Sequence, residues 1–247
     1  MQIDLSGKTA VVTGGNRGIG RSFTKILADA GADVVATYFE STEEEIVVSN
    51  GSVQLIHLDA TDSKLVEEVM AKSAEMLGGK IDILINNAGG LLGRVPTTEM
   101  SDEHFHNVVN VNFSSAFYCT REASKYMPDG GRIVNLASLA AHDGGGPGSI
   151  IYAATKGAIV SFTRGMAKEL SSRKITVNAI SPGFIANTPF HNTFTSEKVQ
   201  DIVAEKTLLK RGGTPDEIAY AALYLVSDMG AYVNGEIMEI NGGLYFV

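Results

Sequence analysis

The chain lacks the residues on which several protein classes depend. Its 247 residues include a single cysteine, Cys119, no tryptophan and six prolines. One cysteine cannot form an intrachain disulfide and argues against a cysteine-rich metal site, so we expect no metal and a buried filler role for Cys119. No apolar run approaches the about 18 residues that a membrane-spanning helix needs. The N-terminus lacks the basic start and apolar stretch of a signal peptide, so we expect a cytoplasmic protein without membrane partners.

Positive charge is also scarce. The sequence has 20 lysines and arginines against 28 acidic residues, a formal net charge of −8. A protein that binds a phosphate backbone needs a basic stripe to release counterions, so we expect no nucleic-acid partner. The remaining composition, 44% hydrophobic and 19% charged, is that of a globular domain long enough to bury a sizeable core.

Short apolar runs alternate with amphipathic segments along almost the whole chain. We expect strands at 9–13, 33–38, 53–58, 81–85, 132–136, 175–180 and 236–240. We expect helices at 19–30, 63–76, 102–126, 152–171 and 215–226, the last opened by a capping box of Thr214 and Glu217. This alternation predicts an α/β fold: one Rossmann-type domain over residues 1–247, a doubly wound parallel sheet of about seven strands with helices on both faces.

Two loops are unusual. Residues 142–149 are rich in glycine, and residues 182–196 contain two prolines and three phenylalanines. Loops that follow the carboxyl ends of strands line the ligand crevice of an open α/β sheet. We therefore expect a substrate loop at about residues 182–200 that acts as a partly mobile lid.

Tyr152 and Lys156 are separated by one turn of a predicted helix, so their side chains point into the same space. An ammonium beside a phenol favours the phenolate and lowers the tyrosine pKa. Such a tyrosine can exchange a proton with a carbonyl or alcohol oxygen near neutral pH. By itself the pair is typical of any half-exposed helix, and its meaning depends on the motifs around it.

A glycine cluster, T-G-G-N-R-G-I-G, connects the first predicted strand to the first predicted helix at Thr13–Gly20. Glycines allow a tight turn and a close approach of the backbone, and the N-terminus of a helix favours a pyrophosphate. The strand–glycine–helix context indicates a dinucleotide site, although the spacing is not G-x-G-x-x-G.

Taken with N-N-A-G at Asn86–Gly89, Ser138, Y-A-A-T-K at Tyr152–Lys156 and the pair Pro182–Gly183, the chain resembles the short-chain dehydrogenase/reductase family along essentially its whole length. The resemblance implies a nicotinamide cofactor, a small-molecule carbonyl substrate and a homo-oligomer, a tetramer or a dimer, of which we expect the homotetramer. It implies a catalytic tetrad of Asn112, Ser138, Tyr152 and Lys156. It implies cofactor contacts from Gly14, Asn16, Arg17, Gly18, Ile19, Gly20, Tyr38, Asp59, Ala60, Asn86, Ala88, Gly89, Tyr152, Lys156, Pro182, Gly183, Ile185 and Thr188.

Within that resemblance each member of the tetrad has its own role. Tyr152 is the acid that protonates the carbonyl oxygen, and Ser138 hydrogen-bonds the same oxygen. Lys156 lowers the tyrosine pKa and holds the nicotinamide ribose, while Asn112 anchors a water that connects Lys156 to solvent. Asp59 is implied at the adenine ring.

The choice of nicotinamide cofactor depends on charge. An acidic residue at the end of the second strand binds the ribose 2′-hydroxyl of NAD and repels the 2′-phosphate of NADP, but Tyr38 occupies that position. Arg17 can pair with a 2′-phosphate, and Ser41 and Thr42 can add hydroxyl donors. Glu40 and the glutamates at 43–45 oppose this. We expect NADPH and leave NADH open.

Three segments, Gly89–Arg94, Asp143–Gly148 and Phe190–Thr195, are similar to those of bacterial reductases of an alginate-derived uronate. These enzymes reduce 4-deoxy-L-erythro-5-hexoseulose uronate to 2-keto-3-deoxy-D-gluconate. The resemblance makes Arg94 a candidate for the substrate carboxylate, and His142 and His191 candidates for its hydroxyls.

The threonine of the substrate loop falls one residue later than in the family pattern. Either Asn187 takes the nicotinamide-carboxamide role or the loop bulges there and Thr188 keeps it.

Two alternatives to the uronate reductase remain. One is a 3-oxoacyl-acyl-carrier-protein reductase, which favours a basic docking patch that a net charge of −8 does not support. The other is a non-catalytic nucleotide-binding sensor, against which the presence of both Tyr152 and Lys156 argues.

Overall fold

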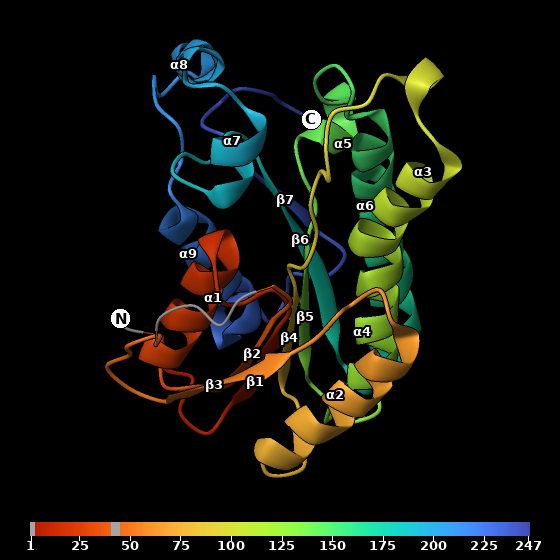
Figure 1. The fold of residues 1–247 in the computed structure, drawn as a ribbon. Coiled ribbons are helices and arrows are strands. Elements are labelled where there is room, and N and C mark those ends of the chain that lie inside the picture. Colours follow the sequence, from red (N-terminus) through yellow and green to blue (C-terminus); the bar gives the residue numbers. More distant parts are fainter. Residues whose placement is uncertain (1–2, 41–44) are drawn as a thin grey trace.

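A seven-stranded sheet with every neighbouring pair parallel forms the centre of the protein (Figure 1). The computed structural model describes residues 3–40 and 45–247. The strand order is β3-β2-β1-β4-β5-β6-β7. The strands are β1 (Thr9–Val12), β2 (Asp33–Tyr38), β3 (Ser52–His57), β4 (Ile83–Asn86), β5 (Arg132–Leu136), β6 (Thr176–Pro182) and β7 (Ile237–Ile240). The predicted doubly wound α/β fold is confirmed, with each expected strand within a few residues of its predicted position.

Helices cover both faces of the sheet (Figure 1) because its strands place apolar side chains on both faces. In β4, Ile83 and Ile85 pack into the core beneath α1 (Gly18–Asp29) and α9 (Pro215–Val226). Leu84 between them points to the opposite core. The helices of that face are α2 (Ser63–Met76), α4 (Ser115–Ala123) and α6 (Ile150–Glu169).

Cys119 belongs to the second core and is 1% exposed. Burial raises the pKa of its thiol to about 12, so it is an inert filler, as expected. Among the helices of the described residues, none is both long and apolar enough to cross a bilayer.

The helix expected at 102–126 is interrupted. It consists of α3 (Asp102–Val109), a π-helical turn η2 (Asn110–Ser114) and α4. Within the turn, Asn112 Nδ2 donates to the carbonyl of Val108 at 2.9 Å and to that of Gly90 at 2.7 Å. The second bond ties the turn to a distant segment, so helical periodicity in the sequence does not reveal the interruption.

The prediction that residues 182–196 form a long loop was only partly correct. β6 continues to Pro182, and the segment then contains α7 (Pro189–Phe194), followed by α8 (Glu197–Lys206). Four further short elements were not predicted: α5 (Ala140–Asp143) and the 3₁₀ turns η1 (Thr97–Glu99), η3 (Ser171–Arg173) and η4 (Asp228–Gly230). Helices this short are marginal by themselves and depend on tertiary contacts. The mobility of the segment stays a prediction.

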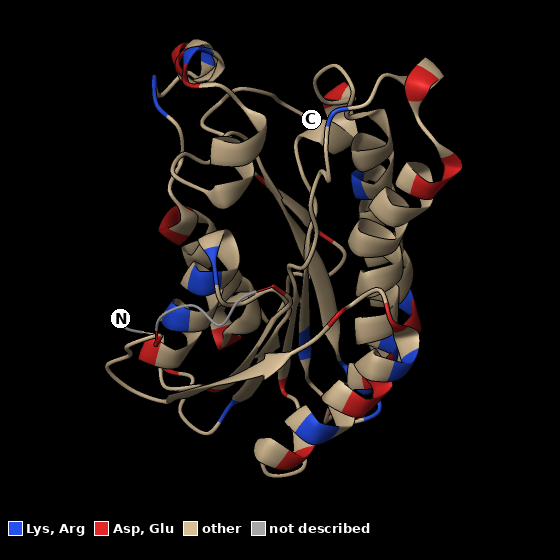
Figure 2. Ribbon diagram, viewed as in Figure 1, with Lys and Arg blue, Asp and Glu red and all other residues tan. Residues whose placement is uncertain are grey.

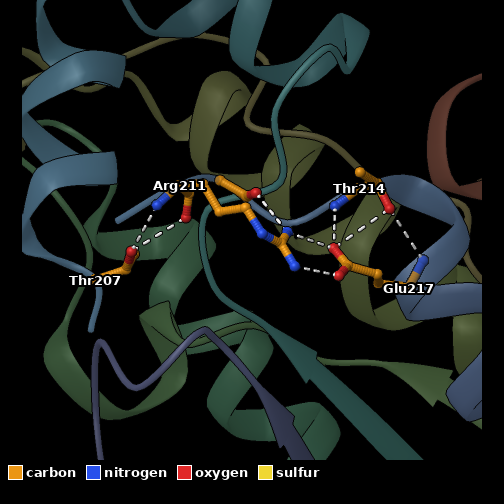
Figure 3. A network of polar contacts seen from close by, with 5 residues as sticks. Thr207, Arg211, Thr214 and Glu217 are labelled. Atoms are coloured by element: carbon orange, nitrogen blue, oxygen red, sulfur yellow. Dashed lines mark hydrogen bonds and ion pairs between the residues drawn. The ribbon is translucent and has the colours of Figure 1, made fainter. Parts of the chain in front are cut away.

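Polar contacts at its base fasten the segment that carries α7 and α8 (Figure 3). Arg211 donates from both terminal nitrogens to Glu217, and Nη1 reaches Oε2 at 2.8 Å. Glu217 also accepts from the Thr214 backbone nitrogen at 2.8 Å, which completes the predicted capping box of α9. Thr207 at the end of α8 accepts from the backbone nitrogen of Arg211 at 3.1 Å. The connection from α8 to α9 is therefore held by a network of hydrogen bonds.

Candidate active site

The candidate site lies where β1 and β4 meet and the connections diverge to opposite faces of the sheet, the topological switch point of such folds. Thr13 Oγ1 accepts hydrogen bonds from the backbone nitrogens of Asn87 and Ala88, each at 3.0 Å. Asn87 Nδ2 donates in return to the carbonyls of Thr13 at 2.9 Å and Gly14 at 3.0 Å. The glycine loop is thus joined to the N-N-A-G segment. Thr13 and Asn87 were not among the predicted site residues, although both lie in the quoted motifs.

The glycine loop has the geometry of an anion site. Gly14 and Gly18 have φ of +61° and +55°, which glycine adopts without strain. Arg17 is the N-cap of α1 and provides no side-chain capping bond, and the first turn holds no acidic residue. The first N–H groups of α1 are consequently available to a phosphate, and the residues fit the pyrophosphate of a dinucleotide.

The residues expected at the adenosine end lie along the same edge. Asp59 follows β3 and accepts from the backbone nitrogen and hydroxyl of Thr61 at 2.9 and 2.7 Å. Ala60 beside it is buried, Ile19 in the first turn of α1 is half-buried, and Asn16 is 4% exposed. These residues lie beyond the carboxyl ends of β1 and β3 and in the first turn of α1.

Asn86 lies deeper than expected. Its side chain is 5% exposed, and Nδ2 donates to Thr120 Oγ1 and Asn135 Oδ1, both at 2.8 Å. Asn135 continues the chain of bonds to Thr163 Oγ1 at 2.9 Å. Asn86 therefore belongs to a buried network that connects β4, β5 and two helices beneath the crevice.

Charges at the end of β2 bear on the cofactor. Tyr38 ends the strand and is half-buried, with its ring edge-on to His57 at 5.7 Å. The guanidinium of Arg17 lies 3.6 Å from the carboxylate of Glu40, and both side chains are exposed. Ser41, Thr42 and the glutamates at 43 and 44 lie outside the described residues. Position 38, at the end of β2, thus carries a tyrosine and no carboxylate, and the guanidinium of Arg17 lies near the same end of the strand.

Three of the four predicted catalytic residues converge between the end of β5 and α6. Lys156 is 3% exposed, and its Nζ donates to the carbonyl of Leu136 at 2.7 Å. The same Nζ lies 5.6 Å from the centroid of the Tyr152 ring. Ser138 follows β5, its side chain lies near that of Tyr152, and its Oγ accepts from the Ala140 backbone nitrogen at 3.2 Å.

Burial dominates the titration of this cluster. Burial raises the pKa of Tyr152 above its ordinary value, and the hydrogen bond with Ser138 opposes that rise. Burial also lowers the pKa of Lys156 to about 8. The prediction that Lys156 lowers the pKa of Tyr152 is therefore not met in the protein alone, because loss of hydration raises that pKa above its ordinary value.

Asn112 approaches the cluster from the π-helical turn. Its Oδ1 accepts from the backbone nitrogen of Gly90 at 3.1 Å. A Cβ on Gly89 would lie 2.7 Å from that oxygen and 3.6 Å from Lys156 Nζ. Asn112 and Lys156 thus adjoin across a position where only glycine fits.

Hydrogen bonds hold the start of the substrate loop, one to β7 and one within the loop. Gly183 donates its backbone N–H to the carbonyl of Ile240 at 2.9 Å, next to Pro182 at the end of β6. Ile185 and Thr188 are each 3% exposed, and Thr188 Oγ1 donates to the Ile185 carbonyl at 3.1 Å. Asn187 has φ of +57°. Thr188 is the N-cap of α7, and which of the two residues takes the nicotinamide-carboxamide role stays a prediction.

α7 covers both halves of the site. The ring of Phe190 lies 5.7 Å from that of Tyr152. Pro189 Cδ lies 3.2 Å from where a Cβ on Gly18 would stand. The helix therefore contacts the glycine loop and the candidate catalytic tyrosine together.

The three substrate candidates have different surroundings. Arg94 is exposed and donates to the carbonyls of Phe194 and Pro147. His191 packs edge-on to the Phe184 ring, and burial together with the charge of Arg94 lowers its pKa to about 4, so it is neutral at pH 7.

The side chain of His142 points toward β7 and the C-terminal segment. Its Nε2 lies 2.8 Å from Glu239 Oε1 of β7, and its ring stacks on Tyr245. Arg94 and His191 are thus brought together at α7, and His142 is held against the C-terminal segment. Among the described residues, no group of three potential ligands could hold a metal ion.

Lys156 is expected to cost the protein stability. A lysine whose folded-state pKa is depressed carries its full penalty below pH 8, where both states are protonated, and loses it as the pH rises toward 10.5. We expect Lys156→Met to raise the free energy of unfolding by roughly 1–3 kcal/mol at pH 7, less at pH 9. Urea denaturation of both proteins without cofactor measures this. An unchanged difference between the two pH values would contradict a buried cation.

Comparisons with known proteins agree with this geometry. A family model described as enoyl-(acyl carrier protein) reductase matches residues 14–245. A short-chain dehydrogenase/reductase of Pestalotiopsis microspora is 35% identical, over 97% of this chain and 96% of that protein. The 3-oxoacyl-[acyl-carrier-protein] reductase of Escherichia coli is 36% identical, over 99% of this chain and 100% of that protein.

Solved structures give the same result. A dehydrogenase/reductase from Sinorhizobium meliloti superposes with a TM-score of 0.92 at 35% identity, covering 99% of this chain and 98% of that one. A short-chain dehydrogenase from Burkholderia cenocepacia in complex with NADP has a TM-score of 0.89 at 32% identity, covering 97% and 98%. Fold, motifs and whole-length identity together establish that this chain is an oxidoreductase of the short-chain dehydrogenase/reductase family that acts on a small molecule.

Proposed function

We propose that the protein is a nicotinamide-dependent carbonyl reductase that works reversibly between a carbonyl and an alcohol. The observation that carries the proposal is the cluster of Ser138, Tyr152 and Lys156 beneath α7, in which the Tyr152 side chain is half-buried and its pKa is raised. A phenol whose pKa is raised stays protonated at neutral pH and can give its proton to a substrate oxygen.

Each residue has a distinct task in this proposal. Tyr152 holds the transferable proton at Oη, and Ser138 donates a hydrogen bond to the oxygen on which charge develops. Lys156 supplies a fixed donor next to the phenol, and Asn112 fixes the Gly89–Gly90 backbone that adjoins Lys156. A bound nicotinamide cofactor supplies the hydride.

The proposed cofactor is NADPH, with NADH as the second candidate. Support comes from Arg17 at the rim of the glycine loop and from the non-acidic Tyr38 at the end of β2. The NADP complex of the Burkholderia neighbour agrees with this choice. The remaining cofactor contacts are proposed for the residues inferred from the family resemblance. Among these, Asn86 acts indirectly, because its side chain is bonded within the buried network.

We expect Arg17→Ala to weaken NADPH binding about tenfold and to leave NADH nearly unchanged, since only NADPH offers a phosphate to the guanidinium. Glu40→Gln is the matched opposite change, because it removes a carboxylate that competes for Arg17 at 3.6 Å, and should tighten NADPH binding. Calorimetric titration of both cofactors measures the ratio. Equal losses for the two would mean that Arg17 only shapes the loop.

The proposed substrate is an open-chain sugar acid, of which 4-deoxy-L-erythro-5-hexoseulose uronate is the leading example. Arg94 supports it, because the guanidinium is exposed at α7 and Nη2 has no partner among the described residues. A carboxylate is the ligand that such a planar fork prefers.

A 3-oxoacyl-acyl-carrier-protein reductase is the second candidate, favoured by the 36% identity to the Escherichia coli enzyme. In the view of Figure 2, basic and acidic segments are interspersed along α2 and α4 and do not form a separate basic area. That surface offers little to an acidic carrier protein.

Cofactor oxidation with freshly prepared uronate, beside an acetoacetyl thioester, tests both candidates. Turnover of the uronate alone supports the proposal, and turnover of the thioester alone replaces it with the second candidate. If neither compound were turned over although NADPH binds, both substrates would be rejected. A cytoplasmic homotetramer stays a prediction, and light scattering after gel filtration tests the assembly.

A further inference from the structure

Arg94 joins two segments that are distant in the sequence. Its Nε donates to the carbonyl of Phe194, the last residue of α7, at 3.2 Å. Its Nη1 donates to the carbonyl of Pro147, in the glycine-rich segment before α6, at 3.1 Å. A guanidinium can make both bonds at once because its donors are held in a rigid planar fork, whereas an ammonium is a single point.

The backbone around this contact is shaped for a close approach. Val95, next to Arg94, donates its N–H to the carbonyl of Gly148 at 3.0 Å. A Cβ on Gly148 would lie 2.9 Å from the Val95 nitrogen, and a Cβ on Gly146 would lie 3.0 Å from Arg94 Nη1. The glycines of this segment leave the room that the arginine occupies.

The held end of α7 is connected to the chemistry by aromatic contacts. The rings of Phe194 and Phe190 lie 5.5 Å apart, and Phe190 lies 5.7 Å from Tyr152. Gln200 of α8 donates to the carbonyls of Thr195 at 2.9 Å and His191 at 3.3 Å. α7 and the start of α8 are thus linked, and Arg94 hydrogen-bonds the end of α7 to the segment before α6.

From this geometry we infer that Arg94 is a positioning residue, which fastens α7 over the site and thereby holds Phe190 against Tyr152. The inference rests on the proposed function, in which Tyr152 gives the proton. Positioning uses Nε and Nη1 of Arg94 and leaves Nη2 for the substrate carboxylate, and it adds one consequence: the loss of Arg94 affects every carbonyl substrate, charged or neutral, because this action passes through α7.

A tryptophan reporter tests the position of α7 without turnover. The sequence has no tryptophan, so Phe194→Trp places a single tryptophan at the end of α7. The change keeps the backbone carbonyl that Arg94 binds. In this background we expect Arg94→Lys to move the emission to longer wavelength and to increase acrylamide quenching at least twofold. Arg164→Lys, an exposed arginine of α6, is the matched control and should change neither.

Kinetics of Arg94→Lys, without the reporter, complete the test. We expect kcat/KM to fall about tenfold for both the uronate and D-erythrose, a neutral hydroxyaldehyde, because the site is misplaced in both cases. Unchanged emission, or a loss confined to KM for the uronate, would overturn the inference and leave Arg94 as a carboxylate ligand. If emission shifts but the wild-type protein reduces neither compound, α7 is fastened by Arg94 and the proposed function fails.

Discussion

Tyr152→Phe is expected to lower kcat by roughly 10³-fold or more while NADPH still binds, because the phenol is the proposed proton donor and phenylalanine has no proton to give. The change removes one oxygen and leaves the ring, so the contact with Phe190 at 5.7 Å should persist. Single-turnover oxidation of enzyme-bound NADPH, with the affinity measured separately by calorimetry, distinguishes a lost acid from a lost cofactor site.

Tyr220→Phe is the matched control for that change. Tyr220 lies on α9 and is 60% exposed, so the loss of its hydroxyl should leave kcat unchanged. If Tyr152→Phe retained more than about a tenth of the wild-type turnover, the general acid would have to be another group. Ser138, which shares a hydrogen bond with the phenol, would then be the next candidate.

Gly20→Ala is expected to have the largest effect on the cofactor site. A Cβ at this position would lie 2.0 Å from the carbonyl oxygen of Gly14 and 2.6 Å from Asn87 Nδ2. The first of these is backbone, so relief requires the glycine loop itself to move. We expect NADPH affinity to fall at least 100-fold, with about 2–4 kcal/mol lost from the free energy of unfolding.

Gly165→Ala is the matched control, since it adds the same methyl group within α6 where a Cβ meets nothing within 4 Å. That variant should bind NADPH normally and be more stable by about 0.5–1 kcal/mol. Urea denaturation and cofactor titration on both variants provide the comparison. Normal NADPH binding by Gly20→Ala would show that the loop is more compliant than its contacts imply.

The predictions that depend on short-range pattern agree with the structure. A near-continuous apolar run placed Ile83, Leu84 and Ile85 on a strand buried on both faces, and parallel strands of this kind require helices on both sides. The capping box of Thr214 and Glu217 was equally local and is present.

Features that arise from distant contacts were missed. The π-helical turn at Asn112 depends on a bond to Gly90, which lies 22 residues away. α7 and α5 are too short to be stable without the surfaces beneath them. The pKa of Tyr152 was misjudged because a sequence shows the neighbouring lysine and does not show that the surrounding protein partly removes water from the phenol.

The candidate site divides in the same way. The sequence by itself determined the elements that carry the chemistry: glycines between a strand and a helix, and a tyrosine and lysine one helical turn apart, since both follow from spacing along one element. Only the tertiary structure decided what each side chain contacts. It assigned two donors of Arg94 to backbone carbonyls, turned His142 to Glu239, and buried Asn86 beneath the crevice. Hydrogen-bond partners come from segments up to 100 residues apart, and their meeting depends on the packing of the whole sheet.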